Sequence, residues 1–529
     1  MGGTAADTAD VIATIFFVSG LNTLLQTTFG DRLPIIQGGS FAFLTPTFGI
    51  IFHPEIMSMG MTDAERFLYT MRVIQGAVFV VGIVQVALGY TGLLVPFIKL
   101  FSPVSIAPTV AMIGLGLAGA MEGNMRSCEW MWVIGVLFFV LFGQIMAKVQ
   151  VPVGKGYKLP IFALFPVIFT IAITWMISGI AEAAADNLDP SCKTVPGVFE
   201  ASRGARFPYP GQWGAPIFKG WAIGPLMGAM VVSMTESIGD YYACAKLAGA
   251  PPPSGAAVAR GLATEGWGLI LCGLFGTSNG TTSYGENIGA ISITKVGSRA
   301  VVQTGGLIML IVGLFPKFGA IFVAMPSPIV AALYSVCFGL IASSGLSLLQ
   351  HADMSSNRNL FILGFCLYNG LAMAGGAGNP NQAGGSYFAG KLQAGLNPFG
   401  ADDNFFMIFF NNTMVMSLLC GVILDNIIPG TKEERGKSVF EGSNSLDSQT
   451  DESMTSVYGL PWCLPKVFRN CVYLDFIYLG GKWPTKPEGG YKASHGDCCE
   501  MLCPCVFPKY AVDEKGEVDV KVTSETAAA

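Results

Sequence analysis

The sequence is poor in charged residues. Only 12% of its 529 residues are Asp, Glu, Lys or Arg, whereas soluble globular proteins carry about 25%. This scarcity excludes an ordinary soluble enzyme. Thirty basic and 35 acidic residues leave a net charge of −5 and form no basic block that could neutralise a run of phosphates. Nucleic acid is therefore not expected as a partner.

Histidine is also scarce, and no catalytic constellation is visible. The three histidines, His53, His351 and His495, fall in loops or in the C-terminal tail. No candidate nucleophile stands with a base in a recognisable pattern. We therefore expect that the protein is not an enzyme and that it holds no metal centre or cofactor.

Long apolar stretches, in contrast, are abundant. Hydrophobic residues make up 52% of the chain, and the mean hydropathy is +0.54. A membrane-spanning helix needs about 20 mostly apolar residues. Stretches of this kind lie at 8–28, 70–95, 100–121, 130–148, 159–182, 219–247, 257–276, 300–325, 328–349, 358–375 and 403–425. Two further apolar segments, 36–53 and 279–296, are rich in Gly, Ser, Thr, Asn and Pro, and we predict that they are broken crossings.

These crossings predict an all-α polytopic membrane protein with one membrane domain over residues 1–425. Within it we predict a first repeat over 1–185, an external loop over 186–216 and a second repeat over 217–425. Residues 426–529 form a polar tail that cannot bury enough apolar surface to fold alone. We expect this tail to be largely disordered.

Basic residues in short loops predict the orientation of the chain. The loops predicted to face the cytoplasm carry Lys148, Lys155, Lys158, Lys246, Arg260, Lys295, Arg299 and Arg358. The same count places the tail inside, the 186–216 loop outside and Met1 outside. The segment before the first apolar stretch lacks the basic region of a signal peptide. We therefore expect that a first helix is missing from the sequence.

The thirteen cysteines differ in their expected surroundings. Cys128 and Cys192 fall in predicted external loops, where a disulfide between them is possible. The cluster from Cys498 to Cys505 leaves lipidation, zinc binding and plain disorder open. Buried thiols are expected in the predicted spans at Cys244, Cys272, Cys337, Cys366 and Cys420.

Two acidic residues lie within the apolar stretch 219–247. Glu236 and Asp240 are four residues apart, so they share one face of a helix. An ionisable residue inside a membrane is costly and is a functional candidate by default. Two carboxylates in a medium of low dielectric repel each other unless a cation or a proton occupies the site. The pair predicts a cation-coupled binding site, with simple solvation of Asp240 at the helix end as the alternative.

The two broken segments predict a polar ligand site. The segment from Asn279 to Lys295 begins with residues that favour extended backbone and continues as an apolar helix. A helix that begins inside the membrane presents unpaired N–H groups and the positive end of its dipole. Glu286 falls at this start, and Gly285 allows a ligand to approach the backbone closely. In the first segment, Phe41 could stack on a flat ring, although small residues there also suit helix packing.

The positions of these segments strengthen that interpretation. Interrupted segments at corresponding places in two halves of a chain indicate the midplane site of a transporter. Each segment is third in its half if one helix is missing at the front. We therefore predict an inverted repeat of seven plus seven segments, of which thirteen are seen.

From about residue 8 to Arg435 the sequence resembles the nucleobase–ascorbate transporter family, solute carrier family 23, within the xanthine/uracil permease superfamily. The motifs that carry the resemblance are Gln37–Phe43, Glu236–Pro253 and the signature Glu286–Gly289 through Thr294–Lys295. The stretches Leu424–Asn426 and Glu433–Gly436 are similar to the end of animal sodium-dependent vitamin C transporters.

The resemblance implies a fold of fourteen helices with a core domain and a gate domain. It implies that the substrate lies between them, that the core moves like an elevator, and that homodimers form through the gate helices in the plasma membrane. It also implies sodium coupling at Asp240 and a structural amide at Asn287. The substrate contacts that it implies are Phe41, Glu236, Tyr284, Gly285 and Glu286.

The expected substrate depends on Glu286. Vertebrate vitamin C transporters have Pro at this position, whereas Tyr284 to Asn287 look like the uracil permease. Acids at Glu236 and Glu286 suit the N–H donors of a uracil or xanthine ring, while anionic ascorbate would meet an additional negative charge. We favour a nucleobase over ascorbate. A non-transporting membrane scaffold stays open because of the missing helix.

Overall fold

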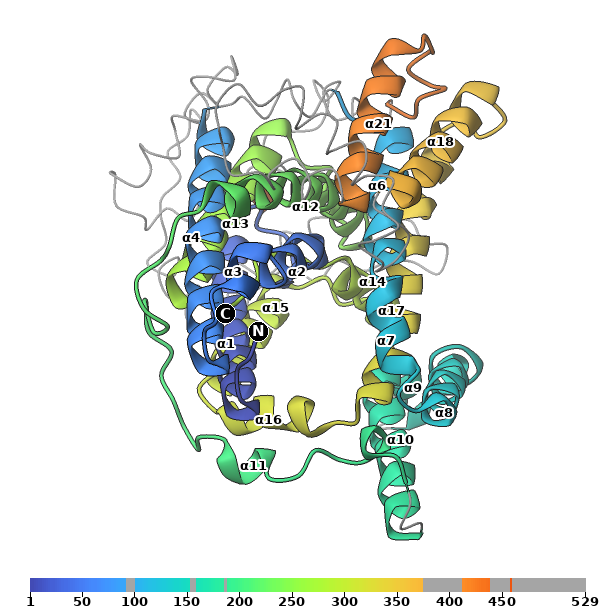
Figure 1. Ribbon diagram of the computed structural model, residues 1–529. Helices are drawn as coiled ribbons and strands as arrows, with labels where there is room; N and C mark the ends of the chain where they lie inside the picture. The colour runs from blue at the N-terminus through green and yellow to red at the C-terminus, as the bar shows by residue number, and fades with distance from the viewer. Residues whose placement is uncertain (92–99, 153–157, 185–187, 374–411, 438–456, 459–529) are drawn as a thin grey trace, which may run out of the picture.

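The computed structural model describes residues 1–91, 100–152, 158–184, 188–373, 412–437 and 457–458. The chain is mostly helical (Figure 1). The longer helices are α1 (Ala5–Phe29), α4 (Asp63–Tyr90), α6 (Pro103–Gly116), α8 (Glu129–Val140), α10 (Pro166–Ala184), α12 (Gly220–Leu247), α13 (Gly255–Phe275), α14 (Gly285–Thr294), α15 (Arg299–Val312), α17 (Ser327–Ser347), α18 (Asn357–Met373) and α21 (Thr413–Ile427).

Short elements connect these helices. The shorter α-helices are α2 (Leu44–Ile51), α3 (Pro54–Ser58), α7 (Ala118–Met125), α9 (Ile161–Leu164), α11 (Val198–Ala201) and α16 (Pro316–Ala324). The turns of 3-10 or π helix are η1 (Phe41–Phe43), η2 (Leu141–Ile145), η3 (Met146–Lys148), η4 (Pro190–Cys192) and η5 (Leu348–His351). The strands are β1 (Gln37–Gly39), β2 (Val151–Pro152), β3 (Lys158–Leu159) and β4 (Thr281–Ser283).

The described ranges contain eight helices that are long and apolar enough to cross a membrane, or nine crossings if α15 and α16 count as one. This confirms the coarse prediction of a multi-pass α-helical membrane protein. The expected straight crossing over 300–325 is wrong, because α15 and α16 meet at an angle of 85°. Pro316 explains the bend, since proline has no amide donor and disfavours helical backbone at the preceding Phe315.

The helices pack as two groups (Figure 1). In the first, here called the core group, α1 packs against α13, α15 and α16, and α4 lies along α12 and α13. In the second, here called the gate group, α17 packs against α6, α7 and α8, and α21 lies along α6 and α18. Helix α12 touches α6 and α21, so it connects the two groups.

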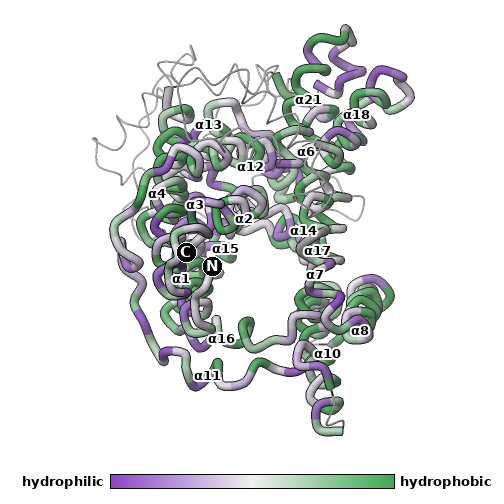
Figure 2. Tube along the Cα trace, viewed as in Figure 1, coloured by the Kyte–Doolittle hydropathy of each residue, from purple (hydrophilic) through white to green (hydrophobic). Residues whose placement is uncertain are grey.

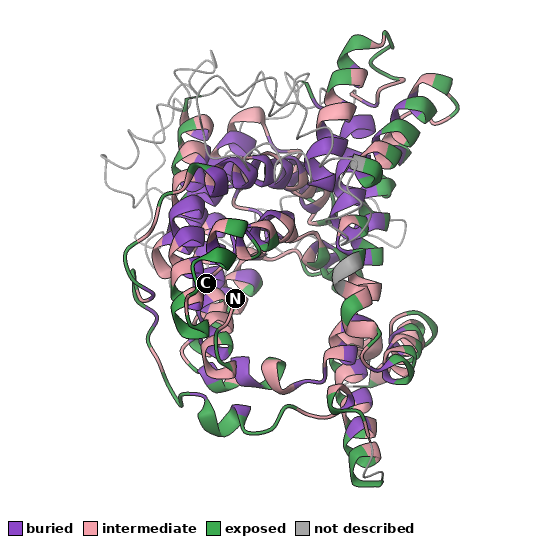
Figure 3. Ribbon diagram, in the orientation of Figure 1, coloured by how far each residue is buried: buried purple, intermediate pink, exposed green. Residues whose placement is uncertain are grey.

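Burial differs between inner and outer helices. Helices α12, α13 and α6 are largely buried, while α8, α10 and α18 expose much of their surface (Figure 3). Both α8 and α10 are rich in apolar residues (Figure 2), and Leu137 and Ile180 are each more than 60% exposed. Large exposed apolar faces suit contact with lipid or with another protein.

The two interrupted segments meet as paired strands. β1 and β4 are antiparallel, with Gln37 opposite Ser283 and Gly39 opposite Thr281. The predicted interruptions are thus present, and they add short strands to an otherwise helical fold. Pairing satisfies backbone groups that a broken helix would leave unpaired inside a membrane. Gly38 is required here, because a Cβ atom would lie 2.4 Å from the ring of Tyr284.

The loop between α10 and α12 joins the two groups. Cys128 and Cys192 form a disulfide, which confirms the pairing considered from the sequence and ties the loop to the start of α8. Further along, Arg206 pairs with Asp10 of α1 at 2.9 Å. The indole N–H of Trp213 donates to the carbonyl of Gly276 at 2.9 Å. The loop is therefore fixed to the gate group at one end and to the core group at the other.

The described chain continues beyond the expected domain boundary at Asp425. The buried carboxylate of Asp425 pairs with Arg358 at 2.8 Å and with Arg435 at 2.7 Å. Residues 428–437 are thereby fixed to the gate group, and Val457 and Tyr458 contact the core group. The cysteine cluster of the tail lies outside the described residues.

Candidate functional site

Two of the predicted site residues lie on the part of α12 that passes the paired strands. Glu236 and Asp240 are both half-buried. Glu236 Oε2 and Asp240 Oδ2 are buried and have no hydrogen-bond partner among the residues that the structure describes. Buried polar atoms are normally paired, so these two oxygens are available to a solute or an ion.

The start of α14 faces the same acids. Tyr284 precedes the first residue of α14, and no side chain in the described part of the chain caps this helix. A Cβ atom on Gly285 would lie 3.0 Å from Asp240 Oδ1, so the backbone of α14 approaches α12 closely. Glu286 lies in the first turn and is exposed. The charge of Glu286 acts on both Glu236 and Asp240, so the three carboxyl groups lie near one another.

An aromatic wall lies beside these acids. The rings of Phe41 and Tyr284 are nearly parallel, with centroids 6.1 Å apart. The Tyr284 hydroxyl donates to the Gly39 carbonyl at 2.7 Å, which fixes its ring. Phe338 of α17 meets Phe41 edge to face at 5.4 Å, so the gate group also reaches this wall. Flat aromatic faces of this kind suit stacking on a planar solute.

Asn287 points to backbone groups. Its side-chain oxygen accepts from the N–H of Ile36 at 3.2 Å, and its NH₂ group donates to the carbonyl of Pro34 at 3.0 Å. These bonds fix α14 to the approach of β1. They fit the expected structural amide better than a direct substrate contact.

Glu265 of α13 is a further buried acid that was not predicted from the sequence. This side chain is 2% exposed and accepts hydrogen bonds from Ser237, Tyr241 and Ser283. It thereby ties α12, α13 and β4 together beside the acids of α12. The sequence did contain a signal for Glu265. It is an ionisable residue inside the apolar stretch 257–276, and an ionisable residue inside such a stretch is also what indicated Glu236.

A line of buried polar groups continues from Glu265. Tyr241 donates to Glu265 at 2.8 Å and accepts from Gln26 Nε2 of α1 at 2.9 Å. Asp31, just beyond α1, is fully buried, and its charge acts on both Tyr241 and Glu265. Burial raises the pKa of Asp31 to about 7. Within the described ranges, no ion pair involves Glu236, Asp240, Glu265 or Glu286.

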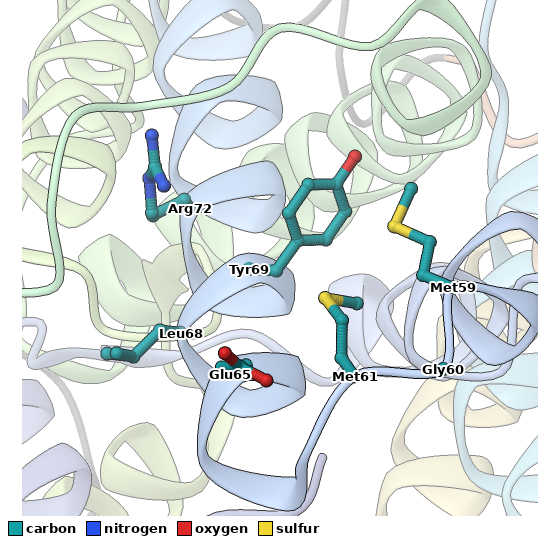
Figure 4. Close-up of a pocket in the computed structure, with 7 residues that line it drawn as sticks. All are labelled: Met59, Gly60, Met61, Glu65, Leu68, Tyr69 and Arg72. Carbon is teal, nitrogen blue, oxygen red and sulfur yellow. The ribbon is translucent and has the colours of Figure 1, made fainter.

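A separate surface pocket lies between α3 and α4 (Figure 4). It has a volume of about 450 Å³ and contains none of the predicted site residues. Its lining is Met59, Gly60, Met61, Glu65, Leu68, Tyr69 and Arg72. The unpartnered acids and the aromatic wall instead lie where the paired strands meet α12.

This combination defines a class of protein. Interrupted segments that meet inside a bundle of membrane-spanning helices are the usual construction of a membrane transporter. The fold is therefore that of a membrane transport protein.

Comparison with known proteins gives the family. Residues 1–377 match the Permease family. Solute carrier family 23 member 2 from Homo sapiens is 37% identical over 517 residues, which cover 90% of this chain and 76% of that protein. Nucleobase-ascorbate transporter 4 from Arabidopsis thaliana is 39% identical and covers 88% of each chain. The chain therefore belongs to this permease family, with the solute carrier family 23 and nucleobase-ascorbate transporters, and its relatives are transporters and not enzymes.

Among solved structures, the chain matches the murine Solute Carrier 26 family member A9 anion transporter. The match has a TM-score of 0.48 and 13% identity, and it covers 69% of this chain and 64% of that one.

Proposed function

We propose that the chain is a sodium-coupled symporter of a nucleobase of the uracil or xanthine type. The observation that carries this proposal is the approach of Glu236 on α12 to Glu286 on α14, beside the rings of Phe41 and Tyr284. A planar solute with adjacent N–H donors matches two acceptor carboxylates and an aromatic face.

The charge of the site supports coupling to a cation. Three carboxyl groups lie near one another, and no described basic side chain forms an ion pair with any of them. Like charges in a medium of low dielectric are stabilised by a cation. Asp240 is the proposed sodium ligand, since its free Oδ2 lies on the side chain that approaches Gly285.

Movement of the core group against the gate group would expose the site alternately to the two sides of the membrane. The acids and both paired strands belong to the core group, whereas Phe338 reaches them from the gate group. We place the protein in the plasma membrane with its tail in the cytoplasm. We expect it to form a homodimer through the exposed apolar faces of the gate helices.

Ascorbate is the second candidate substrate. The names of the plant relatives combine nucleobase with ascorbate, and these relatives match 88% of this chain. Glu286 decides against ascorbate in our proposal, because an anionic solute would lie beside an additional negative charge.

Uptake into cells that express the chain tests these alternatives. Labelled uracil, xanthine and L-ascorbate are each supplied in sodium medium and in medium with choline in place of sodium. We expect uptake of a nucleobase that falls at least tenfold in choline. Equal uptake in both media would overturn sodium coupling, uptake of ascorbate alone would overturn the nucleobase, and no uptake of any of the three would favour a scaffold.

A further inference from the structure

Tyr458 lies in the tail sequence and yet is buried in the core group. Its side chain is 5% exposed, and its hydroxyl donates to the carbonyl of Pro251 at 2.6 Å, in the loop between α12 and α13. Its own carbonyl accepts from Arg260 Nη2 of α13 at 2.7 Å. The carbonyl of Val457 accepts from Arg299 Nη1 of α15 at 3.3 Å. Three different parts of the core group therefore hold two consecutive tail residues.

Tyr458 binds beside Asp31, at one end of the line of buried polar groups that Asp31, Gln26, Tyr241 and Glu265 form. Arg260 also donates through Nε to the carbonyl of Gly30 at 2.8 Å, where α1 ends. The next residue, Asp31, is fully buried, and its charge acts on Tyr458. Tyr458 thus covers the Asp31 end of this line, and Glu265 lies at the other end.

The preceding part of the tail is fixed to the other group of helices. Arg435 pairs with Asp425 of α21, and the carbonyl of Glu434 accepts from Asn359 Nδ2 of α18 at 2.7 Å. The N–H of Asp353 also donates to this carbonyl, at 3.1 Å. One covalent segment therefore contacts the gate group near residue 435 and the core group at residue 458.

We propose that the core group has a docking site for the chain's own tail, formed by Pro251, Arg260 and Arg299, and that Tyr458 is its anchoring residue. Docking slows the transport cycle, because Tyr458 bonds Pro251 and Arg260 and its neighbour Val457 bonds Arg299, so any state in which these three parts of the core group separate loses the tail contacts. A segment that binds one arrangement better than another shifts the equilibrium toward it. This inference goes beyond the proposed function and depends on transport only for its second measurement.

The first measurement is amide hydrogen exchange of the full-length protein in lipid nanodiscs, followed in peptides that cover residues 248–258. We compare the wild type with Tyr458→Ala and with Tyr368→Ala, a matched control whose tyrosine is 74% exposed on α18. Tyr458→Ala should accelerate exchange in these peptides about tenfold, and the control should not. Tyr458→Phe, which keeps the ring and loses the bond to Pro251, should give an intermediate rate and serves if the alanine variant fails to fold.

The second measurement is the maximal uptake rate of labelled uracil, xanthine and L-ascorbate, normalised to protein at the cell surface. The proposal predicts at least a twofold rise for Tyr458→Ala, with KM unchanged. Unchanged exchange would overturn the docking site. Faster exchange with an unchanged or lower uptake rate would overturn the slowing of the transport cycle. If the wild type takes up none of the three solutes, the proposed function fails, while hydrogen exchange still decides whether the tail docks.

Discussion

Gln37 and Ser283 are 246 residues apart in the sequence and lie opposite each other in the β1–β4 pair, where Gln37 Nε2 donates to Ser283 Oγ at 2.7 Å. Ser283 Oγ donates in turn to Glu265 Oε1 at 2.6 Å. The two interrupted segments are therefore joined to each other and to α13. This arrangement fixes the start of α14, with Glu286, against the acids of α12.

Replacement of Glu236 by Gln should strongly reduce uptake of every substrate. The amide keeps the size of the side chain, but it replaces an acceptor oxygen with a donor and removes the charge. Loss of a hydrogen bond to a charged group costs about 1.5–3 kcal/mol, so we expect uptake to fall about 10- to 100-fold.

Surface biotinylation should find the Glu236→Gln variant at the wild-type level, because Glu236 Oε2 has no partner within the described protein. Glu122→Gln is the control, since this glutamate pairs with Arg126 on the surface. Normal uptake by Glu236→Gln would contradict its role in binding.

Replacement of Glu286 by Pro should shift preference from nucleobase toward ascorbate. Glu286 is the second residue of α14, where proline is tolerated because the N–H groups of the first turn have no partner within the helix. The change removes one negative charge from the site. We expect the ratio of ascorbate to nucleobase uptake to rise at least tenfold, about 1.4 kcal/mol in preference.

Competition between labelled xanthine and unlabelled L-ascorbate measures that ratio. Glu286→Gln separates the loss of charge from the effect of the proline ring. A substrate profile that stays the same in both variants would remove Glu286 from substrate selection.

The sequence predicted the parts of the site that follow from local chemistry. Glu236 and Asp240 were predicted because they are acids within an apolar helix. Both broken segments were predicted because Gly-rich sequence interrupts them. Strand pairing between residues 246 apart could not be predicted, because it depends on the packing of several helices. Glu265 was missed although its signal was local, and Pro316 could have indicated the bend between α15 and α16.

Replacement of Glu265 by Ala should destabilise the core group strongly. Ser237, Tyr241 and Ser283 would lose their common acceptor. Each buried donor left without a partner costs about 1–3 kcal/mol, so we expect a loss of at least ~3 kcal/mol. Thermal unfolding of purified protein in detergent checks this, with Glu122→Ala as the surface control. Equal melting temperatures for the two variants would contradict the central place of Glu265.

Replacement of Asp31 by Asn should stabilise the protein more at pH 8 than at pH 5. Burial raises the pKa of Asp31 to about 7 in the folded state, whereas the unfolded side chain titrates near 3.8. The folded state therefore holds this proton more tightly, and stability falls as the pH rises from about 4 to 7. Asparagine removes this loss, which amounts to about 2–3 kcal/mol between the two pH values.

Denaturation midpoints of the wild type and of Asp31→Asn at pH 5 and pH 8 measure this difference. Asp353→Asn is a suitable control, because hydrogen bonds from Ser355 lower the pKa of this exposed carboxyl. An effect of Asp31→Asn that is the same at both pH values would show that Asp31 is charged throughout this range.

We propose that Glu236 and Glu286 bind one solute between α12 and α14. An electron cryomicroscopy map of the protein in nanodiscs, saturated with the nucleobase that it transports, would show the solute and the groups that contact it. We expect density for the ring beside Phe41 and Tyr284, with both carboxyl groups within about 3.2 Å of its nitrogen atoms. Density for the solute in the pocket between Met59 and Arg72, or contact with neither acid, would contradict the claim.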